Sequence, residues 1–207
     1  MTDADRCEGP IAGLTGAVLA GGEARRMGRV NKALVHVGGR PVLDHILDRL
    51  RETCAHVMVI ANTAQPYAAQ AVRVYPDVLP GHGALGGLYS ALCHAPTEHV
   101  FVCACDMPFI SSALIRHLAR RIAAADAAVP RDETRLQPLH AVYARRLAPL
   151  LRPVLERGDL KIENFIRTLS ARVLPFPEVA PFMRAADVFF NVNTPQDLER
   201  ARSQVGD

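Results

Sequence analysis

The chain of 207 residues contains almost no lysine. Only two of its 24 basic side chains are lysines, Lys32 and Lys161, and the others are arginines. The formal net charge is only +3, and basic and acidic residues are mixed along the chain. This distribution gives neither the basic surface of a nucleic-acid-binding protein nor the polybasic tail of a membrane-binding one. We therefore expect no nucleic-acid or membrane partner, and a small anionic ligand fits better than a long polyanion.

Long hydrophobic runs and paired cysteines are also missing. No apolar run reaches the roughly 18 residues of a membrane span, and the first ten residues, MTDADRCEGP, lack the apolar core of a signal peptide. Neither the eight histidines nor the cysteines have zinc-ligand spacing, and the five cysteines form no CxxC pair: Cys7, Cys54, Cys93, Cys103 and Cys105. These absences predict a cytoplasmic protein with reduced cysteines and without structural zinc.

Short apolar runs alternate with helical patterns along the chain. Strands are predicted at 15–20, 56–62, 72–77 and 99–106, and helices at 85–95, 112–125, 145–157 and after Pro195. A further helix is predicted to begin at Pro41, because five apolar residues after it have helical spacing: Leu43, Ile46, Leu47, Leu50 and Cys54. The segment 130–143 is expected to be a loop that leads into a strand, with an antiparallel direction possible.

This alternation is typical of a three-layer α/β/α fold with a mostly parallel, Rossmann-like sheet. The length of the chain and its hydrophobic content of 49% favour one domain. We expect that domain to span residues 14–207, after a flexible N-terminal extension at 1–13.

A glycine-rich segment, LAGGEARRMGRVNK (19–32), follows the first predicted strand. Glycines at the carboxyl end of a parallel strand let backbone amides approach phosphate oxygens, since no Cβ intervenes. Gly22 and Gly28 are one residue too far apart for a Walker loop, with Arg29 in place of its lysine, and this segment contains no GxGxxG. A P-loop ATPase and a Rossmann dinucleotide-binding enzyme are therefore disfavoured.

The pattern LAGGxxxRMGxxxK resembles the first segment of nucleotidyltransferases, and most closely that of the molybdenum cofactor guanylyltransferases, the MobA family. Four later segments resemble the same family in order: VYPD, GALGG, CACDMP and NVNTPQDL. The resemblance covers about residues 15–200 and implies the nucleotidyltransferase fold. It also implies transfer of GMP from GTP to the terminal phosphate of molybdenum-molybdopterin, with Mg²⁺ as cofactor and pyrophosphate as second product. Molybdoenzymes or their chaperones are the recipients that it implies.

The resemblance assigns site residues in three groups. Nucleotide contacts fall on Leu19, Ala20, Gly21, Gly22, Lys32, Asn62, Asp77, Gly83, Gly87 and Asp106. Catalytic roles fall on Lys32, as a point charge, on Arg26, as a forked phosphate donor, and on Asp106, as the Mg²⁺ ligand. The acceptor is assigned to Asn191, Asn193 and Lys161, because amides and a further cation suit a phosphorylated pterin.

Structural readings of these residues stay open. Asp106 could instead cap the helix after Pro108, Asp77 could belong to a turn, and the glycines could serve helix-start geometry. Asn191 and Asn193 could likewise close turns through their own side chains. Against that reading, the strand expected at FFNVNTP (189–195) should end beside Asp106 in this fold.

The sequence departs from the family pattern at three positions. Asn31 stands where an Asp usually precedes the lysine, Ala84 where Pro is common, and Ile60 where Asn is often found. A cytidylyltransferase for the same cofactor and a sugar-1-phosphate nucleotidyltransferase therefore remain alternatives. A further alternative, from a different class, is a non-catalytic carrier that binds nucleotide or pterin.

Overall fold

The computed structural model describes residues 9–21, 31–183 and 187–205. Its main sheet contains the strands Ile11–Leu19 (β1), Cys54–Ile60 (β4), Arg73–Tyr75 (β5), His99–Ala104 (β6), Ala127–Pro130 (β7), His140–Ala144 (β8) and Ala171–Leu174 (β9). They lie in the order β5-β4-β1-β6-β8-β7-β9. Only β8 runs antiparallel to its neighbours in this sheet. The mostly parallel α/β fold predicted from the sequence is therefore confirmed.

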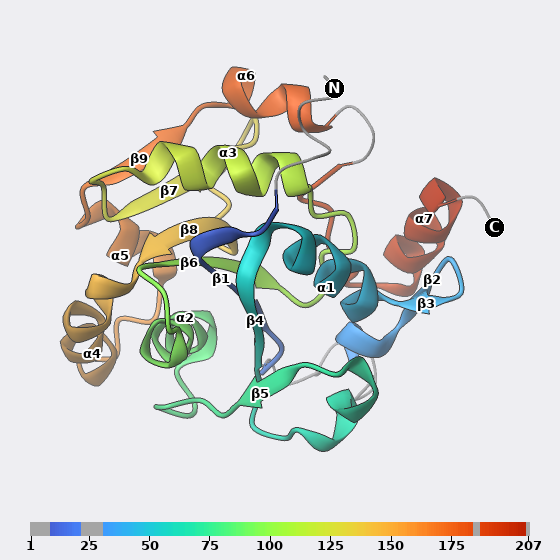
Figure 1. Cartoon of the computed structure of the whole chain (residues 1–207), viewed down its shortest axis with the longest axis horizontal. Helices are drawn as coiled ribbons and strands as arrows, with labels where there is room; N and C mark the ends of the chain where they lie inside the picture. Colours follow the sequence, from blue (N-terminus) through green and yellow to red (C-terminus); the bar gives the residue numbers. More distant parts are fainter. Residues whose placement is uncertain (1–8, 22–30, 184–186, 206–207) are drawn as a thin grey trace.

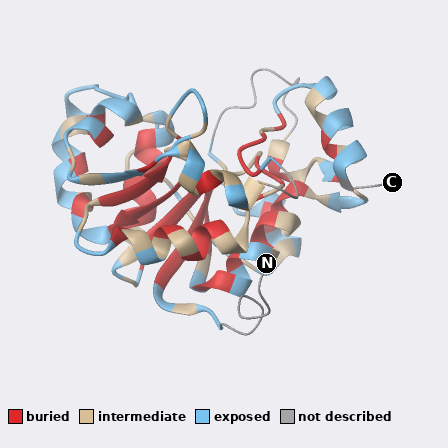
Figure 2. Cartoon of the chain, turned by 90° about the horizontal axis from the view of Figure 1, so that it is seen from above, coloured by how far each residue is buried: buried red, intermediate tan, exposed pale blue. Residues whose placement is uncertain are grey.

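Helices cover both faces of the sheet (Figure 1). One face carries α1 (Val42–Thr53), α3 (Ser112–Ile122) and α6 (Phe176–Val179), and the other carries α2 (Gly83–His94), α4 (Ala148–Glu156) and α5 (Ile162–Arg167). Figure 2 shows the buried residues concentrated on the central strands and on the helix faces that meet them. The sheet thus separates two hydrophobic cores, as a three-layer fold requires.

Short elements complete the fold. A two-stranded sheet pairs β2 (His36–Val37) with β3 (Arg40–Pro41), and four 3₁₀ helices span Lys32–Leu34 (η2), Gln65–Gln70 (η3), Arg145–Leu147 (η4) and Ala180–Met183 (η5). The last helix, α7 (Pro195–Val205), begins where the side chains of Thr194 and Asp197 each accept a hydrogen bond from the other residue's backbone N–H. No helix in the described part of the chain is long and apolar enough to cross a membrane.

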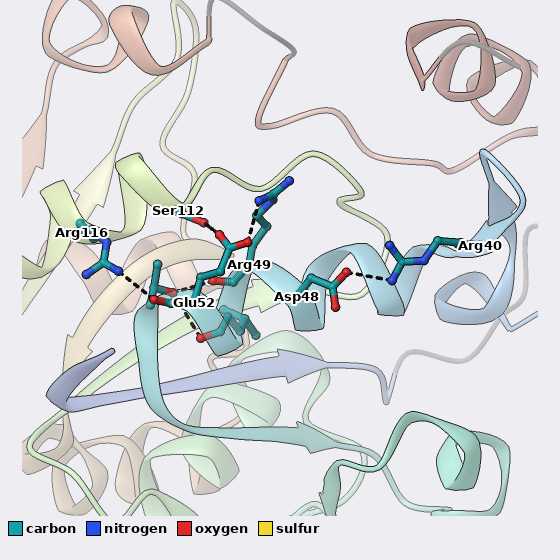
Figure 3. Close-up of polar contacts among 8 residues, drawn as sticks. Arg40, Asp48, Arg49, Glu52, Ser112 and Arg116 are labelled. Carbon is teal, nitrogen blue, oxygen red and sulfur yellow. Dashed lines mark hydrogen bonds and ion pairs between the residues drawn. The ribbon is translucent and has the colours of Figure 1, made fainter. Parts of the chain in front are cut away.

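Apolar spacing and polar contacts together place α1 and α3. The apolar residues predicted between Leu43 and Leu50 are buried against the sheet, and the Ser111 hydroxyl caps α3 by accepting from the N–H of Leu114. At the end of α1, the Glu52 carboxylate accepts a hydrogen bond from the Ser112 hydroxyl at 2.6 Å. The backbone carbonyl of Glu52 accepts one from the Arg116 guanidinium at 2.7 Å (Figure 3). These bonds fix two neighbouring helices beside the central strand.

Three sequence expectations differ from the structure. β1 begins at Ile11, which pairs with Cys54, so residues 11–13 belong to the first strand instead of the N-terminal extension expected at 1–13; residues 1–8 lie outside the described part. β7 and β9 were not predicted. A strand was expected at 189–195, but residues 187–194 form turns and irregular backbone, since the side chains of Asp187 and Asn191 bond to the backbone of Phe189.

Candidate active site

A cavity of about 860 Å³ opens at the carboxyl ends of β1, β4 and β6. Parallel strands deliver loop residues to this edge, which is where α/β folds bind ligands. The described residues that line the cavity include Leu19, Ala20, Gly21, Asn31, Lys32, Ile60, Asn62, Tyr67, Asp77, Gly83, Ala84, Gly87, Cys105, Asp106 and Leu139. Nine of the ten residues expected to contact nucleotide, Lys32 included, therefore line one cavity. The tenth, Gly22, lies outside the described residues, as does Arg26.

Gly21, two residues after the end of β1, lies close to the Asp77 carboxylate in the cavity wall. A Cβ atom at Gly21 would lie 3.3 Å from Asp77 Oδ2 and 3.9 Å from the carbonyl oxygen of Ile60. Gly87 is packed as tightly, since a Cβ there would meet the Leu19 side chain at 3.0 Å. Gly83 has a φ of +58°, a backbone conformation that favours glycine. These three glycines thus have local structural reasons as well as a place in the cavity wall.

Lys32 joins two segments that are distant in sequence. Its Nζ lies 3.4 Å from Asp106 Oδ2 and donates to Asn193 Oδ1 at 2.5 Å. A backbone bond of 2.8 Å from the N–H of Val192 to the carbonyl of Asp106 holds the two segments together. The expectation that the Asn193 segment ends beside Asp106 is met, although that segment is not a strand.

The Asp106 carboxyl sits in a poorly solvated position at the end of β6. Burial raises its pKa, because desolvation disfavours the charged form, and the nearby Lys32 ammonium opposes that shift. No hydrogen bond between this carboxylate and a following helix is present among the described contacts, so the helix-cap alternative has no support there. The carboxylate instead faces the cavity and its only lysine.

Asp106 and Asn193 form an oxygen donor pair that fits a small divalent cation. Within the described ranges, no three His, Cys, Asp or Glu side chains are grouped so as to hold a metal ion unaided. Mg²⁺ needs few protein oxygens, because substrate phosphates and water complete its coordination. Both side chains here direct an oxygen at the Lys32 ammonium, which shows that a cation is accommodated at that point. The donor set therefore suits Mg²⁺ together with a phosphorylated ligand.

A second polar group surrounds Asp77 on the opposite side of the cavity. The Asn62 amide donates to Asp77 Oδ2 at 3.0 Å and accepts from the N–H of Asp77 at 3.0 Å. From α2, the buried Ser90 hydroxyl lies 3.5 Å from Asp77 Oδ1 and accepts from the N–H of Val78 at 2.9 Å. Asp77 is thus held in one orientation and not merely part of a surface turn.

The residues expected to bind an acceptor are not all brought together. Asn193 reaches Lys32, but the Asn191 amide donates to the carbonyl of Phe189 at 2.7 Å and closes a local turn. Lys161 is an exposed residue at the start of α5 and is not among the described residues lining the cavity.

Sequence reasoning missed several cavity residues, among them Tyr67 and Cys105. Tyr67 lies on η3, a short element without apolar periodicity, and its hydroxyl contacts Asn31 and Ala20. Burial raises the pKa of the Cys105 thiol to about 12, so this group is neutral at physiological pH and is not a nucleophile. The position of Cys105 directly before Asp106 is the signal that could have found it.

The three departures from the family pattern also lie in the cavity wall. Asn31 caps η2 by accepting from the N–H of Ala33, and Ile60 and Ala84 present apolar surface. None of the three blocks the approach to Lys32, Asp106 or Asp77, which all line the same cavity.

Comparison with known proteins gives consistent matches over most of the chain. Residues 16–173 match the MobA-like NTP transferase domain. The probable molybdenum cofactor guanylyltransferase of Pelotomaculum thermopropionicum is 36% identical over 188 residues, covering 91% of this chain and 91% of that protein. The molybdenum cofactor guanylyltransferase of Desulfosudis oleivorans is 32% identical over 197 residues, covering 93% and 96%. Among solved structures, molybdopterin-guanine dinucleotide biosynthesis protein A from Archaeoglobus fulgidus aligns with a TM-score of 0.79 and 28% identity, covering 91% of this chain and 97% of that one.

Proposed function

The chain belongs to the family of MobA-like NTP transferases and is a nucleotidyltransferase, and from this premise we propose that it transfers GMP from GTP to the terminal phosphate of molybdenum-molybdopterin. The products are the guanine dinucleotide form of the cofactor and pyrophosphate. The observation that carries the proposal is the convergence of Lys32, Asp106 and Asn193, of which Lys32 and Asp106 line the cavity. A cation and two oxygen donors at one point suit the junction between a triphosphate and an attacking phosphate.

The nucleotide occupies the side of the cavity formed by β1, β4 and α2. Backbone amides near Gly21 approach the phosphates, and Lys32 contributes a compact positive charge. The base lies toward Asp77, whose carboxylate can accept from the two adjacent N–H donors on the Watson–Crick edge of guanine. Cytosine offers only one such donor on that edge, so this fixed carboxylate favours GTP over CTP.

The chemical step exchanges one phosphoric anhydride bond for another. An oxygen of the acceptor's terminal phosphate forms a bond to the α-phosphorus of GTP, while the bond from that phosphorus to the oxygen bridging to the β-phosphorus breaks. The bonding electrons leave with pyrophosphate. A phosphate monoester with a second pKa of about 6 is mostly dianionic at neutral pH, so no protein base has to remove a proton.

Catalysis in this proposal consists of alignment and charge neutralisation. When the ligand binds, Lys32 leaves its present partners, Asp106 and Asn193, and contacts the phosphates. Asn193 then holds the acceptor in register with Asp106. Nucleotidyltransferases generally use a divalent metal, and Mg²⁺ held by Asp106 would supply the charge that lets two phosphate groups approach each other. Arg26 is proposed to bind the outer phosphates, and Asn191 to orient Asn193 through the turn that it closes.

Pyrophosphate release tests the proposal most directly. The full chain is assayed with each of GTP, CTP, ATP and UTP, with and without metal-loaded molybdopterin, at fixed Mg²⁺. We expect release only with acceptor present, and fastest with GTP. Faster release with CTP would make the chain a cytidylyltransferase, and tight GTP binding without any release would make it a carrier.

Two further parts of the proposal concern the cell. The dinucleotide product would pass to molybdoenzymes or to their chaperones, and we place the reaction in the cytoplasm. Detection of the guanine dinucleotide in soluble extracts, and its loss on deletion of the gene, tests both parts together.

A further inference from the structure

The Tyr67 hydroxyl lies between two residues near opposite ends of the glycine-rich segment. One neighbour is the carbonyl of Ala20, directly after β1, at 3.5 Å, and the other is the Asn31 amide, directly before η2, at 3.2 Å. Lys32 is the first residue of η2 and follows Asn31 immediately. One hydroxyl is therefore placed between the chain leaving the sheet and the residue preceding the cavity lysine.

The hydrogen-bond directions at this point follow from the donors present. The N–H of Ala33 can only donate, and it donates to Asn31 Oδ1 at 3.2 Å. The other end of the Asn31 side chain, Nδ2, is therefore the end that faces Tyr67, and it donates to the hydroxyl oxygen. The hydroxyl proton of Tyr67 is then free to be donated, and the carbonyl of Ala20 is the acceptor within reach. The chain of bonds runs in one direction, from Asn31 through Tyr67 to Ala20.

Tyr67 itself is firmly held. Its side chain is 3% exposed and packs in the core that contains α1 and α3, while its hydroxyl reaches the cavity wall. The end of η3 is fixed by Arg51, which donates to the carbonyl of Gln70 at 2.7 Å. Burial raises the pKa of Tyr67, so the hydroxyl keeps the proton that this arrangement needs at neutral pH. A rigid anchor thus presents one donor and one acceptor to two cavity segments.

We propose that Tyr67 is a positioning residue that connects Ala20 with Asn31 and thereby sets the place of Lys32 relative to Asp106 and Asn193. The inference rests on the proposed function, because the triphosphate is the ligand for which Lys32 is positioned. Tyr67 does not act on the reacting atoms. It acts through Asn31, whose side chain also caps the 3₁₀ turn that carries Lys32.

The test compares two tyrosine-to-phenylalanine substitutions. Tyr67→Phe keeps the buried ring and removes the bridging hydroxyl. Tyr75→Phe is the matched control, since the described contacts include no hydrogen bond from its hydroxyl, and its ring stacks on His94 outside the cavity wall. Hydrogen–deuterium exchange is followed without nucleotide over residues 33–35, whose amides donate to Asn31 and Lys32.

We expect faster exchange over residues 33–35 in Tyr67→Phe by roughly five- to tenfold, the size of effect for loss of one or two neutral hydrogen bonds, and no change in Tyr75→Phe. The double variant Tyr67→Phe, Asn31→Ala should exchange little faster than Asn31→Ala alone, because both substitutions break the same connection. Unchanged exchange in Tyr67→Phe, or fully additive effects in the double variant, would overturn the proposal.

A kinetic arm separates this inference from the function on which it rests. In the pyrophosphate assay, Tyr67→Phe should lower kcat/KM for GTP about five- to tenfold and leave the KM for molybdopterin unchanged. Equal increases in both KM values would indicate general loosening and contradict positioning of Lys32. If the wild-type chain released no pyrophosphate from any nucleotide, the proposed function would fail, whereas the exchange experiment would still decide the role of Tyr67.

Discussion

Lys32 and Asp106 form an ion pair that both residues must give up, at least in part, when a charged ligand binds. The side chains are 19% and 16% exposed, so solvent screens them only partly. In the structure each residue neutralises the other, and Asn193 completes the environment of the ammonium. A metal-bound triphosphate can replace this pairing by offering a cation to Asp106 and anions to Lys32. The resting ion pair therefore keeps both groups oriented without a ligand.

The scarcity of lysine allows a matched test of Lys32. Lys32→Met keeps the length of the side chain and removes its charge, and we expect GTP affinity to fall at least about tenfold, the scale of a lost charge-assisted contact. Lys161→Met is the control for nucleotide binding, because Lys161 is exposed and does not line the cavity. Calorimetric titration of both variants with GTP measures the difference. Similar GTP affinities for the two variants would remove Lys32 from the nucleotide site.

Asp106 provides a prediction in which activity and stability change in different directions. Burial raises the pKa of this carboxyl in the folded state, so folding favours its protonated form, and its ionisation lowers stability as the pH rises through the folded pKa. Asp106→Asn removes that ionisation, and we expect unfolding free energy at pH 7 equal to or above that of the wild type. Turnover should fall by about a thousandfold or more, because the proposed metal ligand is lost.

Urea unfolding and the pyrophosphate assay, run on the same Asp106→Asn preparation, measure both effects. Near-wild-type turnover with unchanged metal dependence would contradict the assignment of the metal to Asp106. A large loss of stability at pH 7 would contradict the account of its ionisation.

At the scale of elements, α2 connects the nucleotide side of the cavity to the core. Ser90 is fully buried on this helix, and its hydroxyl donates to the carbonyl of Gly86 while accepting from the N–H of Val78. Asp77 precedes Val78, so the helix fixes the loop that carries the proposed base-binding carboxylate. This loop has no regular structure of its own and depends on α2 for its position.

Ser90→Ala should therefore weaken both the fold and the nucleotide site. Loss of a partner for the N–H of Val78 is expected to cost about 1–2 kcal/mol of unfolding free energy, and the KM for GTP should rise several-fold. Ser203→Ala is the control, since that exposed hydroxyl also donates to a carbonyl of its own helix, at Arg200, but fixes no loop. If both substitutions changed the GTP KM equally, the link from α2 to Asp77 would be wrong.

The elements predicted correctly are those with strong apolar periodicity. β1, β4, β6 and α1 each contain enough branched or regularly spaced apolar residues to identify them. β7 was missed because AAVP has little β-branched character, and β9 because four residues at the sheet edge, ARVL, give no period. The pair of phenylalanines at 189–190 suggested a strand, but side-chain bonds from Asp187 and Asn191 impose turns.

The candidate site was predictable to a similar extent. Asp106, Asp77 and Gly21 directly follow strands or belong to ordered motifs, so their meeting at the sheet edge could be expected. Tyr67 could not be found in this way, because its contribution depends on where a 3₁₀ helix places one hydroxyl. Lys161 was assigned by residue type alone; it lies at the start of α5 and is not among the described residues lining the cavity, so its contact with the acceptor stays a prediction.

At the scale of the whole molecule, His140 connects the middle of the sheet to the segment that carries Asn193. It lies opposite Cys103 on β6, and its ring meets the edges of Phe101 and Phe189 at 5.1 and 5.2 Å between centroids. Neither ring nitrogen has a hydrogen-bond partner among the described atoms. Burial lowers the pKa of His140 to about 3, because a charged imidazole would be desolvated between apolar groups.

This buried imidazole makes stability depend on pH in a defined direction. His140 stays neutral in the folded chain down to about pH 3, whereas in the unfolded chain it binds a proton near its ordinary pKa of about 6.5. The unfolded state therefore binds more protons between these values, and the unfolding free energy falls by about 1.4 kcal/mol per pH unit from this residue as the pH decreases. Above about pH 6.5 the residue has no further effect on the pH dependence.

Replacement of this residue by leucine should remove that dependence. For His140→Leu we expect a slope of unfolding free energy against pH that is smaller by about one proton between pH 6 and 4, and unchanged above pH 7. Stability at pH 7 should not fall, because the substitution also removes a ring nitrogen that lacks a partner. His56→Leu, at an exposed position on β4, is the matched control and should leave the slope as it is in the wild type. Urea unfolding at several pH values measures the slopes. An identical slope for wild type and His140→Leu would show that the histidine takes up its proton in the folded state at the same pH as in the unfolded state. In that case Phe101 and Phe189 would pack against a charged imidazole, and the acid sensitivity of the fold would originate elsewhere in the chain.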